Sequence, residues 1–208
     1  MSNEVIESRS REILFQNGKS FWFASLFLSK KSTRDAVILY AFCRLLDDWA
    51  DSGGDAGPKK LNDLIDLFNR SVGKENNLSG QVLSSKSFSQ SEKELTVEFL
   101  NLRLSIPILL QLLKGLQKDT ERALVEEKSQ LIVYAYRVAG TVGLFMAQIL
   151  GAESDKAKYH AVDLGIAMQL TNVCRDVLED ARMGRRYLPN SFLPSLTATA
   201  DIETREKI

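Results

Sequence analysis

Three carboxylates lie close together at the end of an apolar stretch, within residues 47–51. The run before them has apolar residues on nearly every side of a helical wheel, which is typical of a buried helix. At about 100° per residue, Asp47 and Asp51 fall on one narrow stripe of that helix. The same stripe carries Tyr40 and Arg44. Because burying unpaired charge is costly, we expect this stripe to face a cavity, a cation or a counter-charge.

A second stripe of oxygen-bearing side chains lies within residues 169–180. Asn172, Asp176 and Asp180 are spaced four residues apart, so they line one face of a helix. Gln169 falls close to the same face, and an apolar strip runs alongside it. We therefore expect a second helix that is mostly core but carries a line of polar side chains.

The two stripes together indicate a site for divalent cations. Either one alone could be a solvated acidic helix end, and two of them facing each other across a dry core would repel. Carboxylate and amide oxygens, without clustered His or Cys, suit a hard ion such as Mg²⁺. Arg44 and Arg175, each beside one stripe, can bind phosphate oxygens. The residues thus indicate metal-assisted phosphate or diphosphate chemistry in a helical cavity.

Composition argues against several other classes of protein. The chain has 208 residues, of which 44% are apolar and 26% charged, as in ordinary soluble proteins. Basic and acidic residues balance at 27 each, so no basic field indicates a nucleic-acid partner. Cys43 and Cys174 form no C-x-x-C pair, which argues against a thiolate zinc site. His160 is the only histidine, and no G-x-S-x-G motif accompanies it, so a Ser–His relay is not expected.

The apolar spacing is helical throughout, which predicts an all-α fold. We expect a single bundle-like domain over residues 1–208, with polar, solvated connections at 71–91 and 118–128. We expect Asn17 and Gly18 to end the first helix at positive φ, and Ser32 or Thr33 to cap the third. The expected helices cover residues 4–17, 21–28 (packed on the core), 33–51, 59–70, 92–105, 108–117, 127–151 and 155–182.

The longest apolar run, at 131–151, is about long enough to span a bilayer. Arg137 lies near its middle, where a charge is costly in lipid, so a buried helix of a soluble protein is favoured. Residues 1–11 are charged rather than apolar, so no secretory signal is visible. We expect a cytoplasmic protein, with peripheral membrane association left open.

The motifs resemble those of the squalene/phytoene synthase family. The two aspartate motifs are D-x-x-x-D and N-x-x-R-D-x-x-x-D, and four other segments accompany them in family order. The residues of the last motifs are most similar to those of the bacterial phytoene synthase branch. One departure is that Asn17 and Gly18 precede the Lys-Ser pair, where the family often has other residues. The matching segments are 19–21, 40–44, 47–51, 134–143, 172–180 and 184–189.

This resemblance implies an all-α bundle of the isoprenoid synthase type, with two prenyl diphosphates bound in a central cavity. Family members join the two substrates head to head through a cyclopropylcarbinyl diphosphate, which then rearranges and loses its diphosphate. The leading hypothesis is conversion of geranylgeranyl diphosphate to phytoene through prephytoene diphosphate, in carotenoid biosynthesis. Because the family continues through further helices after the Y-L-P segment, we expect this chain to be C-terminally truncated.

The resemblance also assigns roles to particular residues. Asp47 and Asp51 would hold Mg²⁺ on one diphosphate, and Mn²⁺ could replace it. Asn172, Asp176 and Asp180 would hold Mg²⁺ on the other diphosphate. Contacts to diphosphate oxygens are expected from Lys19, Ser20, Tyr40, Arg44, Gln169, Arg175 and Arg185.

Tyr134 is the candidate for orienting or deprotonating an intermediate, although it could equally be a core tyrosine. Gly140 and Gly143 suit a close helix approach or a kink beside the cavity. Without a G-x-G-x-x-G motif, NADPH is not expected. The alternatives left open are a squalene, dehydrosqualene or hydroxysqualene-type synthase using farnesyl diphosphate, a non-catalytic assembly factor, and a prenyl-diphosphate binder or lone cyclase. The sequence does not indicate an oligomeric state.

Overall fold

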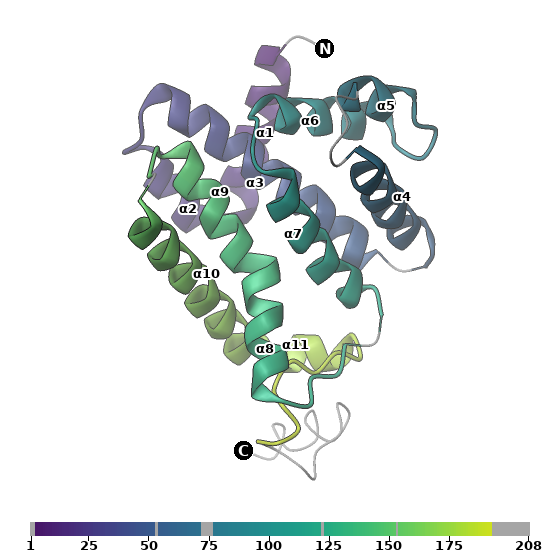
Figure 1. Ribbon diagram of the computed structural model, residues 1–208, viewed down its shortest axis with the longest axis vertical. Helices are drawn as coiled ribbons and strands as arrows, with labels where there is room; N and C mark the ends of the chain where they lie inside the picture. The colour runs from purple at the N-terminus through teal and green to yellow at the C-terminus, as the bar shows by residue number, and fades with distance from the viewer. Residues whose placement is uncertain (1–2, 53, 72–76, 122, 153, 193–208) are drawn as a thin grey trace. The chain divides into compact units, whose positions relative to one another are not determined.

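The computed structural model describes the chain as helices joined by short connections (Figure 1). In the part of the chain that the structure describes, one isolated β-bridge pairs Leu124 with Arg186. The predicted all-α class is therefore confirmed. Contacts divide the chain into two compact units, Met1–Leu110 with Gln148–Ala152 and Gln111–Ala147 with Glu153–Ile208. The described residues are 3–52, 54–71, 77–121, 123–152 and 154–192.

The first unit is built around α3, which packs against three other helices, α1, α4 and α6. Its side chains at Val37, Ile38, Phe42 and Leu46 are all fully buried, which confirms the predicted core helix. Phe42 also stacks on Phe99 of α6, with ring centroids 4.0 Å apart. The helices of this unit are α1 (Asn3–Asn17), α2 (Lys19–Ser25), α3 (Lys30–Asp51), α4 (Ala56–Ser71), α5 (Leu78–Ser84), α6 (Gln90–Asn101) and the start of α7 (Ile106–Asp119).

The cap of α3 differs from the prediction. Ser29, rather than Ser32 or Thr33, occupies the cap position, and its hydroxyl accepts a hydrogen bond of 3.1 Å from the backbone N–H of Ser32. Thr33 instead donates to the carbonyl of Ser25, so its hydroxyl ties α3 to the end of α2. The helix therefore starts three residues earlier than expected.

Two further expectations for this unit are wrong. Residues 71–91 are not a plain solvated connection, because they contain α5 and the buried side chains of Val82 and Phe88; residues 72–76 lie outside the described part. The segment 21–28 is helical only up to Ser25, and its side chains at Phe23 and Phe27 are 63% and 75% exposed instead of packed on the core.

Gly18 does separate α1 from α2, but not through positive φ. Its φ is −135°, a value open to any residue. A Cβ at this position would lie 2.9 Å from the Tyr40 hydroxyl oxygen. Glycine therefore permits the close approach of the α1–α2 junction to the Tyr40 ring.

In the second unit, the predicted long helix 127–151 forms with a π-helical segment, η1, in its middle. A Cβ on Gly143 would lie 2.2 Å from the carbonyl oxygen of Ala161, and one on Gly165 would lie 2.4 Å from that of Ala139. The expected close helix approach at Gly143 is thus confirmed. The elements of this unit are the end of α7, α8 (Lys128–Ala135), η1 (Tyr136–Gly140), α9 (Thr141–Ile149), α10 (Asp155–Arg175) and α11 (Val177–Arg182).

The segment Lys128–Ile149 is long and apolar enough to cross a membrane by length and composition. Core helices of soluble proteins pass the same test. At Gly143 this segment packs directly against the backbone of α10.

The connection between α7 and α8 was expected to be solvated, which is wrong. Asp119 is 7% exposed and Val125 is 8% exposed. The backbone N–H of Val125 donates to the carbonyl of Arg186, while the N–H of Arg186 donates to the carbonyl of Ala123. Two segments far apart in the sequence are thereby tied together.

The predicted helix 155–182 is interrupted at Asp176, where φ is −100° and ψ is 15°. The hydrogen-bond spacing nevertheless continues, because Asp176 N–H donates to the carbonyl of Asn172 and Asp180 N–H to that of Asp176. The three oxygen-bearing residues therefore keep their four-residue spacing across the break.

Candidate functional site

The first aspartate motif lies in the last two turns of α3. Asp47 is half-buried, whereas Asp48 and Asp51 are exposed. The Arg44 guanidinium lies 2.7 Å from Asp48 Oδ1, with both side chains about half-exposed. Arg44 therefore pairs with Asp48, which lies one turn further along α3 and is not one of the two aspartates that define the D-x-x-x-D motif.

Tyr40, Arg44 and Asp47 are close enough to affect one another. Burial raises the pKa of Tyr40; the positive charge of Arg44 opposes this effect and the negative charge of Asp47 adds to it. The predicted stripe on α3 thus does bring these three side chains together.

Lys19 and Ser20 are exposed in the first turn of α2. The adjacent Phe21 ring lies 6.1 Å from the Tyr40 ring, measured between centroids. The K-S-F segment and the Tyr40 end of the stripe are therefore neighbours within the first unit.

Trp49 anchors the acidic end of α3, a role that the sequence analysis missed. Its indole N–H donates to Glu92 Oε1 at 2.9 Å, and Lys60 Nζ lies 2.8 Å from the same oxygen. The ring also stacks on Phe88, with centroids 5.4 Å apart. Burial alone would raise the pKa of Glu92, but hydrogen bonds from Lys60, Ser89 and Trp49 outweigh it and lower the pKa. The network fixes the rotation of the helix that carries the motif.

The second motif lies at the α10–α11 junction. Arg175 forms two bonds of 2.6 Å with the carboxylate of Asp176. Asn172 donates to the side chain of Gln169 at 3.4 Å, and both are half-buried. These four predicted residues therefore lie together, with a bidentate arginine–carboxylate pair at their end.

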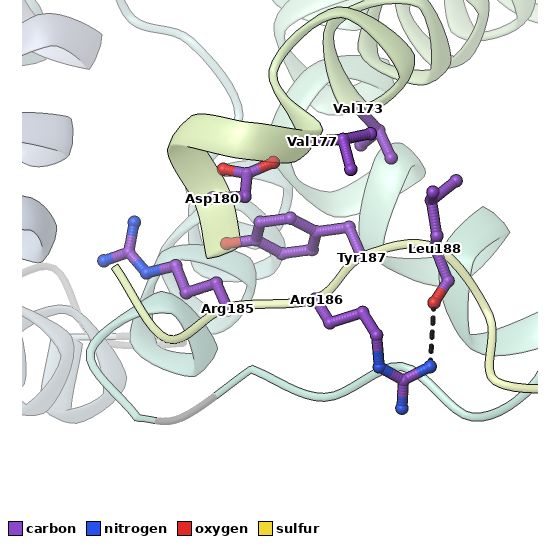
Figure 2. A pocket seen from close by; sticks show the side chains of 7 residues that line it. All are labelled: Val173, Val177, Asp180, Arg185, Arg186, Tyr187 and Leu188. Atoms are coloured by element: carbon purple, nitrogen blue, oxygen red, sulfur yellow. Dashed lines mark hydrogen bonds between the residues drawn. The ribbon is translucent and has the colours of Figure 1, made fainter. Parts of the chain in front are cut away.

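The pKa of the Asp180 carboxyl group is raised above its ordinary value. Burial raises its pKa to about 6, and the charge of Asp176 adds to the effect; Arg185 opposes it, and Asp119 raises it further. Figure 2 shows Asp180 beside Tyr187, with Arg185 on one side and Arg186 directed toward Leu188. These side chains line a small cavity together with Val173 and Val177.

The two neighbouring arginines of the G-R-R-Y-L-P segment have different roles. Arg185 donates to the backbone carbonyl of Asp119 at 2.7 Å. Arg186, which is 7% exposed, bonds the carbonyl of Leu188 and the carboxylate of Glu126, each at 3.1 Å. Arg186 thus stabilises the segment, while Arg185 lies close to Asp180 and Asp119.

Tyr134 lies in an apolar cluster with Tyr187 and Val173. Its hydroxyl donates to Asp119 Oδ2 at 3.1 Å, and the Tyr187 hydroxyl donates to Asp119 Oδ1 at 2.5 Å. The two rings stack with centroids 4.6 Å apart. The sequence analysis missed Asp119 and Tyr187: Tyr187 stood in a recognised motif, but Asp119 lay in a segment that was expected to be solvated.

The oxygen donors of both motifs fit a hard divalent ion by type. Within the part of the chain that the structure describes, no three His, Cys, Asp or Glu side chains are grouped so that they could hold a metal ion. The two motifs belong to different units, and each supplies its own carboxylates. The Mg²⁺ ligand set accordingly stays a prediction.

Comparison with known proteins decides the family. A family model described as squalene/phytoene synthase matches residues 14–205. The chain belongs to the squalene/phytoene synthase family. The resemblance seen in the motifs is therefore confirmed.

Individual relatives agree with this assignment. The chain is 32% identical to a 15-cis-phytoene synthase from Paracoccus sp., covering 97% of this chain and 65% of that protein. It is 34% identical to a phytoene synthase from Thermus thermophilus, covering 87% of this chain and 58% of that protein. The chain thus spans less than two thirds of the length of these relatives.

Solved structures show the same fold. A dehydrosqualene synthase in complex with a ligand matches with a TM-score of 0.72 and 32% identity, covering 91% of this chain and 62% of that one. A squalene synthase from Alicyclobacillus acidocaldarius matches with a TM-score of 0.74 over 97% of this chain and 73% of that one. At 19% identity, the second match supports the fold alone.

Proposed function

We propose that this chain carries out the head-to-head condensation of two prenyl diphosphates, with geranylgeranyl diphosphate as substrate and phytoene as product. The observation that carries this proposal is the presence of two oxygen-rich motifs in a member of this family, each with an arginine paired to a carboxylate of the motif segment. Each motif would bind one diphosphate through Mg²⁺ or Mn²⁺. The chain would contribute to carotenoid biosynthesis and would not require NADPH.

The metal would supply positive charge to the departing diphosphate as its C–O bond ionises. Asp47 and Asp51 would hold it at one motif, and Asn172, Asp176 and Asp180 at the other. Arg175 now pairs with Asp176, so its guanidinium would become available for diphosphate oxygens when Asp176 turns to the cation. Arg44 pairs with Asp48, which is not one of the proposed ligands, and it would bind a diphosphate oxygen from its half-exposed position beside that carboxylate.

The remaining predicted side chains would bind the diphosphates or protect the cation. At the first motif, Tyr40 is close to Arg44 and Asp47, and Lys19 and Ser20 precede Phe21, whose ring lies near that of Tyr40. At the second motif, Gln169 accepts a hydrogen bond from Asn172, and Arg185 is close to Asp180. Apolar side chains beside them would keep water away from the allylic cation formed on ionisation. The double bond of the second substrate would then attack this cation, and loss of a proton would close the cyclopropane ring of prephytoene diphosphate.

The second candidate is a dehydrosqualene-type synthase acting on farnesyl diphosphate. The match to a dehydrosqualene synthase, at 32% identity and a TM-score of 0.72, favours it among the alternatives. Its C30 product would differ in length from the C40 product of the leading proposal.

Product analysis separates these proposals. The chain is incubated with Mg²⁺ and either farnesyl or geranylgeranyl diphosphate, with and without NADPH, and C30 and C40 hydrocarbons are resolved. We expect C40 product without NADPH, and none from Asp47→Ala or Asp176→Ala. A C30 product would favour the second candidate. Absence of product with every donor, together with unchanged ligand binding in both variants, would contradict a synthase and favour a non-catalytic family member.

We also propose peripheral contact with membranes by a cytoplasmic protein. Phe23, Leu26 and Phe27 are 63%, 62% and 75% exposed, and the two phenyl rings lie 5.3 Å apart. Exposed Lys30 and Lys31 begin α3, after Leu28 and Ser29. Apolar side chains beside lysines suit an anionic bilayer surface, and apolar prenyl chains would be delivered there.

A further inference from the structure

Asp119, a carboxylate outside both aspartate motifs, is buried in the second unit between Tyr134 and Tyr187. Asp119 is the last residue of α7 and is 7% exposed. Burial of a carboxylate is costly unless its oxygens are hydrogen-bonded. Here each oxygen accepts a hydrogen bond from a tyrosine, Oδ2 from Tyr134 and Oδ1 from Tyr187. The carboxylate therefore connects α7, α8 and the G-R-R-Y-L-P segment.

The direction of these hydrogen bonds matters for chemistry. A phenol has one proton and two lone pairs, and Tyr134 points its proton at Asp119. Its oxygen is thereby left to accept, not donate, a further proton. Burial, followed by the negative charge of Asp119, raises the pKa of both Tyr134 and Tyr187 well above the ordinary value, so both phenols are neutral. A neutral Tyr134 can take up a proton only if it passes its own proton on.

The surroundings hold Asp119 in place for such a transfer. Arg185 donates to the backbone carbonyl of Asp119 at 2.7 Å, and the side-chain oxygens accept hydrogen bonds from the two tyrosines. The stacked rings of Tyr134 and Tyr187 lie in the apolar cluster with Val125 and Leu131. Both the backbone and the side chain of Asp119 are thus fixed by neighbours.

We propose that Asp119 is the positioning residue for Tyr134 and the final acceptor of the proton lost during condensation. This inference rests on the proposed function. A C–H bond of the cationic intermediate breaks, and its electron pair forms the C–C bond that closes the cyclopropane ring. The proton goes to the Tyr134 oxygen while the Tyr134 O–H proton goes to Asp119 Oδ2. The cation becomes neutral, the carboxylate becomes an acid, and Tyr134 ends as it began.

The first test separates proton transfer from binding and folding. Asp119→Asn keeps the size of the side chain and an acceptor oxygen but cannot take up a proton in the same way. We expect kcat to fall by about 100-fold, as for loss of a general base, with KM within about twofold. Asp119→Glu should recover part of the loss. Tyr187→Phe, which leaves the Tyr134–Asp119 bond in place, should cost far less than Tyr134→Phe.

A second readout follows the fate of the substrate. If ionisation persists but proton removal fails, Asp119→Asn should release diphosphate together with prenyl alcohol instead of hydrocarbon. An unchanged kcat would overturn the proposal. The proposal would also be overturned if Asp119→Asn lowered kcat, substrate affinity and melting temperature together and Asp119→Glu restored none of them. That result would indicate a structural role only.

A third measurement does not require turnover, so it distinguishes failure of this inference from failure of the proposed function. With tyrosines labelled at the ring carbon that bears oxygen, NMR follows the chemical shift of Tyr134 at neutral pH. We expect this shift to differ between the wild type and Asp119→Asn, because the Tyr134 hydroxyl loses its hydrogen bond to a carboxylate. Identical Tyr134 shifts in the two proteins would overturn the contact on which the relay depends, whether or not the chain forms product.

Discussion

At the scale of single residues, the two motifs differ in how exposed their carboxylates are. Asp51 is exposed on α3, whereas Asp180 is half-buried beside Asp176. The pKa of Asp180 rises from its ordinary value of 3.8 to about 6, first through burial and then through the charge of Asp176. The charge of the Asp180 carboxylate therefore changes with pH near 6.

We expect Mg²⁺ binding at the second motif to weaken as pH falls through about 6, because protonated Asp180 is a poor ligand. The loss should approach tenfold per pH unit below this value. Asp180→Asn should bind Mg²⁺ weakly with a flat profile from pH 5 to 8. Isothermal titration of the wild type and Asp180→Asn tests this, and a wild-type affinity independent of pH would contradict it.

The same shift predicts an effect on folding. Because the pKa is raised in the folded state, the stabilisation due to Asp180 is complete below about pH 3.8 and is lost as pH rises through about 6. Asp180→Asn removes this loss, so it should gain stability relative to the wild type between pH 4 and pH 8. Urea unfolding of the metal-free chain at both pH values measures the difference.

At the scale of helices, apolar periodicity was enough to predict most of the elements. Residues 4–17 and 108–117 were expected as helices, and α1 and α7 cover them. The sequence did not predict α5, since its polar, serine-containing segment is held by the burial of Val82 and not by local pattern. Nor did it predict the break at Asp176, which local helix propensity does not require.

For the site, residue type and spacing predicted the side chains that share one helix. They did not predict the side chains that come together from different helices through tertiary contacts. Asp176 and Asp180 follow from a four-residue period. Asp119 and Tyr187 meet although they are 68 residues apart in the chain, and Trp49 finds Glu92 at a separation of 43. No local pattern encodes such pairs.

The Trp49–Glu92–Lys60 network predicts how firmly the first motif is held. Glu92→Ala should lower the free energy of unfolding by about 2 kcal/mol, as for loss of hydrogen bonds to a charged group that is partly buried. Gln90→Ala, on the exposed side of the same helix, is the control and should change it by less than about 0.5 kcal/mol. Denaturant unfolding compares the two, and equal effects would contradict the anchoring role.

Close packing of α9 on α10 gives a second prediction for these elements. A Cβ on Gly143 would meet the backbone oxygen of Ala161, which cannot rotate away, so Gly143→Ala should cost about 2 kcal/mol or more. Gly140→Ala is the matched control, because the nearest atom there is 3.0 Å away in the Tyr136 side chain. Similar melting temperatures for the two variants would contradict the assigned close approach.

At the scale of the whole molecule, the charges balance, but one part of the surface combines exposed aromatic side chains with lysines. The chain has 27 basic and 27 acidic residues, yet the end of α2 exposes Phe23 and the turn after it exposes Phe27, shortly before two exposed lysines. We expect the chain to sediment with vesicles containing phosphatidylglycerol and to lose most of this binding in Phe23→Ser/Phe27→Ser. Tyr159→Ser, which removes a 71% exposed aromatic residue on α10, should retain it. Equal binding by both variants would contradict the assigned surface.

The central claim is that the two motifs bind one prenyl diphosphate each through a divalent cation. The most direct measurement is the stoichiometry of a non-hydrolysable thio-diphosphate analogue in isothermal titration with Mg²⁺. We predict two analogues per wild-type chain, one for Asp47→Ala, one for Asp176→Ala, and two for the control Asp55→Ala. One analogue per wild-type chain, or an unchanged stoichiometry in both motif variants, would contradict the account.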